Sequence, residues 1–100
     1  ERTIGLSGRK SLESGTGLLF IFEKSGKYGF WMKDMMFPID IVWISESRRV
    51  IGVEKNISPN SYPTLFYPKE AVKYVLELNS NDAENFGIDI GSMLYFDTKK

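Results

Sequence analysis

The chain has 100 residues, which is enough for one domain with its own core and too few for two, so we expect a single domain over residues 1–100. Its composition, 42% hydrophobic and 26% charged, is that of a globular protein rather than a disordered one. Thirteen basic residues balance 13 acidic ones, so no net charge draws the chain to nucleic acid or to anionic lipid.

The sequence contains no cysteine and no histidine. Disulfides, thiolate nucleophiles, zinc sites built on these residues and Ser-His-Asp triads are therefore excluded. Carboxylates, lysine, tyrosine and hydroxyl side chains remain for chemistry, and we predict no metal and no other cofactor. The longest apolar run, residues 18–22, is far shorter than the roughly 20 residues that span a bilayer, so no transmembrane segment is predicted.

The first third of the chain predicts a helix end and two strands. Residues 1–6 have the pattern of the end of a helix, with Gly8 as its stop signal. Residues 17–23 are apolar and partly aromatic, which favours a strand at this length. Residues 24–27 then predict a hairpin turn into a strand over residues 28–33.

The middle of the chain predicts two further strands and an irregular segment. Pro38 interrupts the chain, and residues 39–45 form the next predicted strand. A polar turn over residues 46–49 leads into a strand over about residues 50–55. Residues 56–68 contain three prolines and are predicted to form no regular element.

The last third predicts two strands and a short helix. Residues 70–79 alternate between apolar and polar side chains, which predicts a half-buried strand with Glu77 on its polar face. Asn81 and Glu84 resemble a capping box that opens a short helix, and a final strand is predicted over residues 92–98. The expected fold is mainly β (α+β): a compact antiparallel β-barrel or two-sheet sandwich of about six strands, with one or two short helices.

The segment FWMKDMMFPID, residues 30–40, encloses one lysine and two aspartates among eight apolar residues. A charge buried in such a run needs a partner, because an isolated buried ion is strongly unfavourable. In an extended strand Trp31 and Lys33 project from the same face, and Asp40 is the natural partner of Lys33, with Arg9 as competitor. Two interpretations stay open: an ion pair that fixes strand register, or the polar end of a ligand pocket.

Aspartates on either side of Pro38 raise a second possibility. Asp34 and Asp40 would be an acid/base pair if the protein hydrolysed glycosidic bonds. Asp34 has a simpler explanation as a turn residue whose side chain bonds its own backbone.

Aromatic residues form a further candidate group, made up of Trp31, Trp43, Tyr62, Phe66 and Tyr67. A Pro- and aromatic-rich loop near a strand that carries Trp and Lys would offer a stacking platform for sugars or peptides. The alternative is that these side chains simply fill the core of a small β domain.

The order of motifs resembles a known family. The series reads GLS-x-R-x-x-L at residues 5–12, GLLF-x-F at 17–22, FWMKD at 30–34, PID at 38–40, YVLE at 74–77 and GI-x-x-G at 87–91. It resembles, over residues 2–96, the uncharacterised prokaryotic family numbered 192 among the domains of unknown function. The departures from its usual pattern are Ser7 for Met, Asp34 for Asn, Met35 for Thr and Ser92 for Asp.

The resemblance implies a compact β-rich fold with short helices and no established activity. It also implies an upstream strand and a signal or anchor segment before Glu1, and therefore an extracytoplasmic protein, secreted or membrane-anchored. If the family has a shared site, the matching positions here are Arg9, Trp31, Lys33, Pro38, Asp40 and Glu77.

The hypothesis from the sequence is a non-catalytic binding module, monomeric, for a small molecule, glycan or peptide. Its predicted ligand-binding residues are Arg9, Trp31, Lys33, Asp40 and Glu77. The alternatives are a carboxylate-based hydrolase and a structural or partner-binding domain. No nucleic-acid partner is expected.

Overall fold

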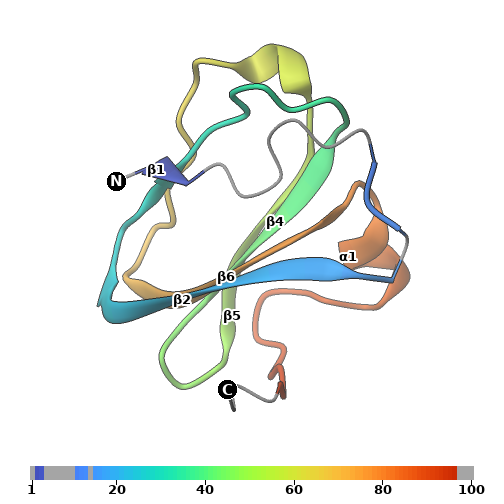
Figure 1. Ribbon diagram of the computed structural model, residues 1–100. Helices are drawn as coiled ribbons and strands as arrows, with labels where there is room; N and C mark the ends of the chain where they lie inside the picture. The colour runs from blue at the N-terminus through green and yellow to red at the C-terminus, as the bar shows by residue number, and fades with distance from the viewer. Residues whose placement is uncertain (1, 4–10, 14, 97–100) are drawn as a thin grey trace.

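A computed structural model describes residues 2–3, 11–13 and 15–96 of the chain. Its main feature is a four-stranded antiparallel sheet with the strand order β2-β6-β4-β5 (Figure 1). The strands are β2 (Gly17–Gly26), β4 (Ile39–Ile44), β5 (Val50–Ile57) and β6 (Val72–Asn79). Strands β6 and β4 are therefore central, and β5 forms one edge of the sheet.

A second, two-stranded sheet lies outside the main one. It pairs β1 (Arg2–Thr3) in parallel with β3 (Gly29–Phe30). The predicted helix end at residues 1–6 is wrong where the structure describes it, because Arg2–Thr3 is extended and pairs with a distant strand. Residues 4–8 lie outside the described part of the chain.

The mainly β prediction is confirmed, but the sheet does not close into a barrel. The strand expected over residues 28–33 is shortened to β3. The strand expected over residues 92–98 is not formed in its described part, residues 92–96, where an isolated bridge pairs Met93 with Arg49. Residues 97 and 98 lie outside the described part.

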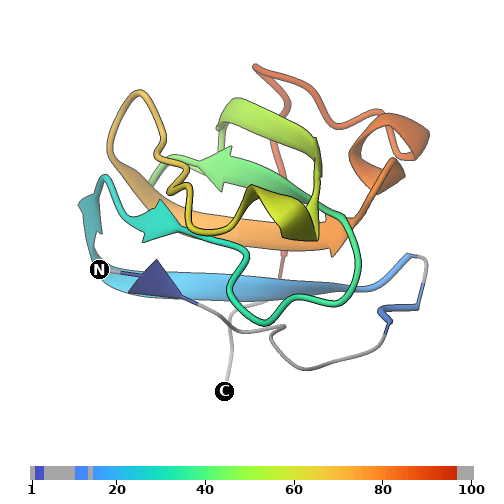
Figure 2. The ribbon, with the colours of Figure 1, turned by 90° about the horizontal axis from the view of Figure 1, so that it is seen from above.

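Both faces of the main sheet are covered by apolar side chains. Every residue of β4 is buried, and successive side chains point to opposite faces. The core on one face includes Phe30, Met32, Ile41, Trp43 and Val75. The core on the other includes Val42, Ile44, Val50, Tyr74 and Leu78, with Ala83 of the short helix packed among them. In Figure 2 β2 (blue) and β6 (orange) run side by side, as their pairing requires.

The helix after β6 exists, but it is not capped as the sequence predicts. Helix α1 (Asp82–Asn85) is one turn long, and its N-cap residue Asn81 adopts a left-handed conformation (φ 78°) with no side-chain capping bond. A second single turn, η1 (Pro59–Ser61), interrupts the otherwise irregular segment before β6. No helix among the described residues is long and apolar enough to cross a membrane.

Asp34 lies in a turn, as predicted, but its side chain makes no hydrogen bond to the backbone among the described residues, so that part of the prediction is wrong. The Met35 N–H donates to the Met32 carbonyl oxygen at 3.1 Å, and Asp34 has a φ of 58°. Asp and Asn adopt this left-handed conformation more readily than most residues. The turn therefore explains why either side chain suits this position.

Candidate functional site

Trp31 and Lys33 lie together on the surface, beside the Pro- and aromatic-rich segment. The half-buried Trp31 ring meets the Tyr62 ring at 4.9 Å between centroids, tilted by 59°. The exposed Lys33 places its Nζ 5.8 Å from the centroid of the Trp31 ring. The structure thus brings together two of the five aromatic residues of the predicted stacking platform, Trp31 and Tyr62. Trp43 is instead buried in the core, and Phe66 packs against that core. Arg9 lies outside the described residues.

Asp40 does not belong to this surface. Its side chain is 0% exposed, and both carboxylate oxygens accept backbone hydrogen bonds at 2.9 Å: Oδ1 from Asn56 N–H and Oδ2 from Ala83 N–H. The expectation that Lys33 neutralises a buried Asp40, or that both open into a cleft, is wrong. Asp40 is held by main-chain donors, and Lys33 is exposed.

Glu77 lies on the other face of the sheet from Asp40. In the β4–β6 register Glu77 pairs with Ile41, whereas Asp40 pairs with Leu78. Because alternate strand residues face opposite ways, the two carboxyl groups are separated by the sheet and cannot share one site.

The environment of Glu77 also corrects the sequence-based expectation of a polar strand face. Its side chain is 3% exposed, and Oε1 has no hydrogen-bond partner among the described residues. Burial raises the pKa of the Glu77 carboxyl from 4.5 to about 7. Residue 77 is buried because both faces of β6 are covered, which the alternation in one strand cannot reveal.

The paired-carboxylate hypothesis for Asp34 and Asp40 is not supported. Asp34 is exposed in its turn, while Asp40 is fully buried and both of its oxygens are occupied. A general acid or base must reach the substrate, and Asp40 has no exposed atom with which to do so.

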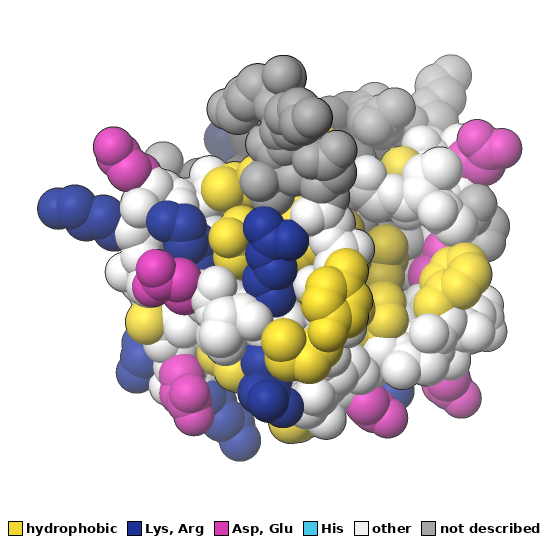
Figure 3. Space-filling view, turned by 90° about the horizontal axis from the view of Figure 1, so that it is seen from below, with side chains coloured by type: hydrophobic (Ala, Val, Ile, Leu, Met, Phe, Trp, Pro, Cys, Tyr) yellow, Lys and Arg dark blue, Asp and Glu magenta, His cyan; other side chains and the backbone are white. Residues whose placement is uncertain are grey.

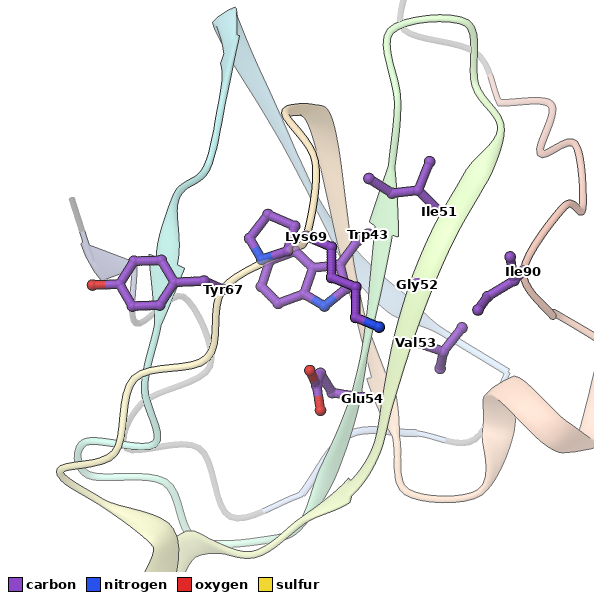
Figure 4. A pocket seen from close by; sticks show the side chains of 9 residues that line it. Trp43, Ile51, Gly52, Val53, Glu54, Tyr67, Lys69 and Ile90 are labelled. Atoms are coloured by element: carbon purple, nitrogen blue, oxygen red, sulfur yellow. The ribbon is translucent and has the colours of Figure 1, made fainter.

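A pocket lies at the β5 edge of the sheet, and two residues of the predicted aromatic group, Trp43 and Tyr67, line it. It has a volume of about 230 Å³ and is bounded by β4, β5 and the chain just before β6. Figure 4 shows its lining side chains. They are Trp43, Ile51, Gly52, Val53, Glu54, Tyr67, Pro68, Lys69 and Ile90.

Trp43 contributes the most unusual polar group in the pocket. Its side chain is 2% exposed, and its indole Nε1 is buried without a hydrogen-bond acceptor among the described residues. The nitrogen-bearing edge of the ring faces the side of the pocket where Glu54 and Lys69 lie (Figure 4). Buried Trp N–H groups usually have a partner, so this one is a candidate for a ligand acceptor atom.

Gly52 determines how Trp43 sits. The two residues are directly paired across β4 and β5, and a Cβ at position 52 would lie 3.1 Å from Cδ1 of Trp43. A side chain here would crowd the indole, so glycine allows the ring to lie close against β5. Tyr67, by contrast, points its ring away from Trp43 (Figure 4) and places it over Gly29.

Two charged side chains complete the pocket. The carboxylate of Glu54 and the ammonium group of Lys69 point toward the same space as the Trp43 nitrogen (Figure 4). Across residues 2–3, 11–13 and 15–96 neither side chain has an ion pair or a hydrogen bond. The pocket therefore presents one acceptor group and two donor groups to a ligand.

The ionisable side chains that line the pocket are Glu54, Tyr67 and Lys69, and no two of them form a hydrogen-bonded nucleophile and base. The described residues also contain no cluster of three or more acidic side chains that would hold a metal ion.

Glu54 and Lys69 are not among the site residues predicted from the sequence, although the sequence carries one signal near this pocket. Gly52 interrupts the β-branched run of Val50, Ile51 and Val53, and an isolated strand glycine often marks a close approach of another group. The position of Lys69 carries no such signal, because the chain reaches the pocket only through the tertiary fold.

Comparison with known proteins places the chain among uncharacterised relatives. No curated protein matches it significantly. A crystal structure of a protein of unknown function from Novosphingobium aromaticivorans DSM 12444 is 28% identical, with a TM-score of 0.86, covering 95% of this chain and 71% of that one. A protein from Sinorhizobium meliloti 1021, described as a candidate transcription regulator, is 29% identical, with a TM-score of 0.82, covering 87% of this chain and 67% of that one.

A family model covers nearly the whole chain. It is DUF192, described as "Uncharacterized ACR, COG1430", and it matches residues 1–96. The motifs quoted above fall within this span, and the similar structures share the fold. The chain belongs to the DUF192 family.

Proposed function

We propose that this protein is a non-catalytic binding module for a small molecule, glycan or peptide, with the pocket beside Trp43 as its main site. One observation carries the proposal: the indole N–H of Trp43 is a buried donor without an acceptor in the part of the chain that the structure describes, and it faces a pocket that also contains Glu54 and Lys69. A bound acceptor atom would remove the unfavourable free energy of leaving this N–H unpaired.

The two tryptophans of the chain provide a direct test by NMR. Each indole N–H gives its own resonance in a ¹⁵N-labelled sample, and Trp31→Phe and Trp43→Phe assign the pair. A ligand of the pocket is expected to shift the Trp43 indole resonance and leave that of Trp31 in place. If a broad panel of metabolites, saccharides and peptides shifts no resonance of the pocket residues, the proposal is wrong.

The platform of Trp31, Tyr62 and Lys33 is a second candidate site, favoured by the ring contact at 4.9 Å and the 43% exposure of Tyr62. Flat exposed aromatic rings suit stacking against sugars. Oligosaccharides in the same panel test it, with the roles of the indoles reversed: shifts at Trp31 alone would assign glycan binding to the platform.

The description of the Sinorhizobium meliloti relative raises nucleic-acid binding as a rival. The equal numbers of basic and acidic residues do not favour it. On the face shown in Figure 3 the Lys and Arg side chains are interspersed with acidic and hydrophobic ones. Adding duplex DNA to the labelled protein tests this rival, which would be supported by shifts at basic residues that weaken as salt rises.

A further inference from the structure

The pocket beside Trp43 holds one side chain of each charge. Glu54 comes from the edge strand β5 and is half-buried, while Lys69 comes from the chain before β6 and is exposed. They line the same space without forming an ion pair within the described part of the chain. Two opposite charges that face one pocket and do not neutralise each other favour a ligand that carries both complementary charges.

The donor and acceptor groups are also asymmetric. The ammonium group of Lys69 and the indole N–H of Trp43 both donate, while the carboxylate of Glu54 only accepts. An anionic group suits the two donors, and a cationic group suits Glu54. The remaining lining is largely apolar, with Ile51, Val53, Pro68 and Ile90.

We infer that the pocket binds a free α-amino acid with an apolar side chain, in its zwitterionic form; this inference rests on the proposed binding function. The carboxylate of the ligand accepts from Lys69 and from the Trp43 N–H, and its ammonium group donates to Glu54. Its side chain contacts Ile51 and Ile90. The volume of about 230 Å³ is below that of drug-sized ligand sites, roughly 300 Å³ and above, and fits a molecule of this size.

Other ligand classes match the pocket less well. A monoanion would leave Glu54 unpaired and add a second negative charge beside it, and a monocation would do the same to Lys69. A neutral sugar would satisfy the Trp43 N–H but would pair neither charge.

Four compounds separate these classes by NMR titration of the Trp43 indole resonance: leucine, N-acetylleucine, leucine amide and glucose. Leucine is expected to bind at least about tenfold more tightly than either singly charged analogue, because each analogue loses one charged contact. Glucose is expected to bind more weakly still.

Two variants test the assignment of each charge. Glu54→Gln is expected to weaken leucine binding about tenfold. It is expected to strengthen N-acetylleucine binding, because this analogue lacks the ammonium group and the variant removes the negative charge that repels it. Lys69→Met is expected to weaken leucine binding and to strengthen leucine amide binding, because the variant removes the positive charge that repels this analogue. The exposed neighbours Glu70 and Lys55 supply matched controls, Glu70→Gln and Lys55→Met, which are expected to leave all affinities unchanged.

The outcomes separate this inference from the proposed function. Equal affinities for leucine and its analogues, tighter binding of glucose, or leucine binding that neither variant weakens would each overturn the zwitterion inference while leaving a binding pocket. A Trp43 resonance that no compound of any class moves would overturn both.

Discussion

The Oδ2 atom of Asp40 accepts a hydrogen bond of 2.9 Å from the backbone N–H of Ala83, a residue 43 positions further along the chain. Asp40, in the central strand β4, therefore caps helix α1. Asn81, the N-cap residue of α1, makes no side-chain capping bond itself. Oδ1 of the same carboxylate binds Asn56 N–H in β5, where Asn56 has a φ of 56°. One buried carboxylate therefore fixes the ends of two elements.

Replacing Asp40 is expected to destabilise the fold strongly. In Asp40→Asn the amide offers one acceptor oxygen, and its NH₂ group faces a backbone N–H. We expect the free energy of unfolding, measured by urea denaturation, to fall by about 2–4 kcal/mol. The control is Asp34→Asn, at an exposed residue with φ 58°, which is expected to change stability by less than about 0.5 kcal/mol. Equal effects of the two substitutions would contradict the capping role.

The buried Glu77 predicts a stability that falls as pH rises. Its pKa is raised from 4.5 to about 7, so between these values the folded protein keeps a proton that the unfolded chain has lost. The stabilisation from this group is complete below pH 4.5 and is lost as pH rises through about 7. At about 1.4 kcal/mol per pH unit, the loss is on the order of 3 kcal/mol.

Glu77→Gln removes this dependence, because glutamine resembles the protonated carboxyl and does not titrate. The free energy of unfolding is measured by urea denaturation at pH 4.5 and at pH 8. Relative to the wild type, that of the variant is expected to rise by on the order of 2–3 kcal/mol between these two pH values. Glu70→Gln, at an exposed residue, is the control and is expected to show a constant difference. If the difference in unfolding free energy between Glu77→Gln and the wild type is also the same at both pH values, the predicted rise in the pKa of Glu77 is wrong.

Gly52 is expected to control the shape of the pocket. In Gly52→Ala the new Cβ would lie 3.1 Å from Cδ1 of Trp43, so the indole must shift. We expect the Trp43 indole resonance to move in the ligand-free protein and the affinity of any pocket ligand to fall. Gly26→Ala, where the new Cβ would lie 3.1 Å from the Tyr28 ring, is a matched control that should spare both properties. Unchanged affinity in Gly52→Ala would place the ligand elsewhere.

Arg48 is expected to hold the C-terminal segment against the sheet. Its guanidinium carbon lies 4.5 Å from the centroid of Phe96 and 5.7 Å from that of Tyr74, and Nη1 donates to the Phe96 carbonyl oxygen at 2.8 Å. Arg48→Lys keeps the charge but loses the planar stacking group, so unfolding free energy is expected to fall by about 1–2 kcal/mol.

Arg49→Lys supplies the comparison for this prediction. Arg49 is exposed, and among the described residues its side chain donates one hydrogen bond, to the Gly91 carbonyl oxygen at 3.2 Å, so a change below about 0.5 kcal/mol is expected. Hydrogen exchange of the Leu94 amide, which donates to the Arg48 carbonyl oxygen, reports on the segment directly. If the Leu94 amide exchanges faster in Arg49→Lys than in Arg48→Lys, Arg48 is not the residue that holds the C-terminal segment against the sheet.

The strands of the main sheet could be predicted because their signal is local. The apolar run that becomes β4 and the break at Pro38 both depend on neighbouring residues, and the structure begins β4 at the predicted residue. The candidate site could not be predicted in the same way. Trp31 and Lys33 do lie together, but Asp40 and Glu77 lie on opposite faces of the sheet, and alternation in one strand does not reveal what covers each face.

The class of fold and the excluded kinds of chemistry follow from the amino-acid sequence, because strand propensity and the absence of Cys and His are properties of the chain alone. Which charged side chains are buried and which line a pocket depends on the tertiary fold. Asp40 is occupied by main-chain donors from two other elements, whereas Glu54 and Lys69 meet at a pocket although they lie on separate segments. The physical reason is that burial and pairing depend on contacts between residues distant in sequence, which follow from strand order and register.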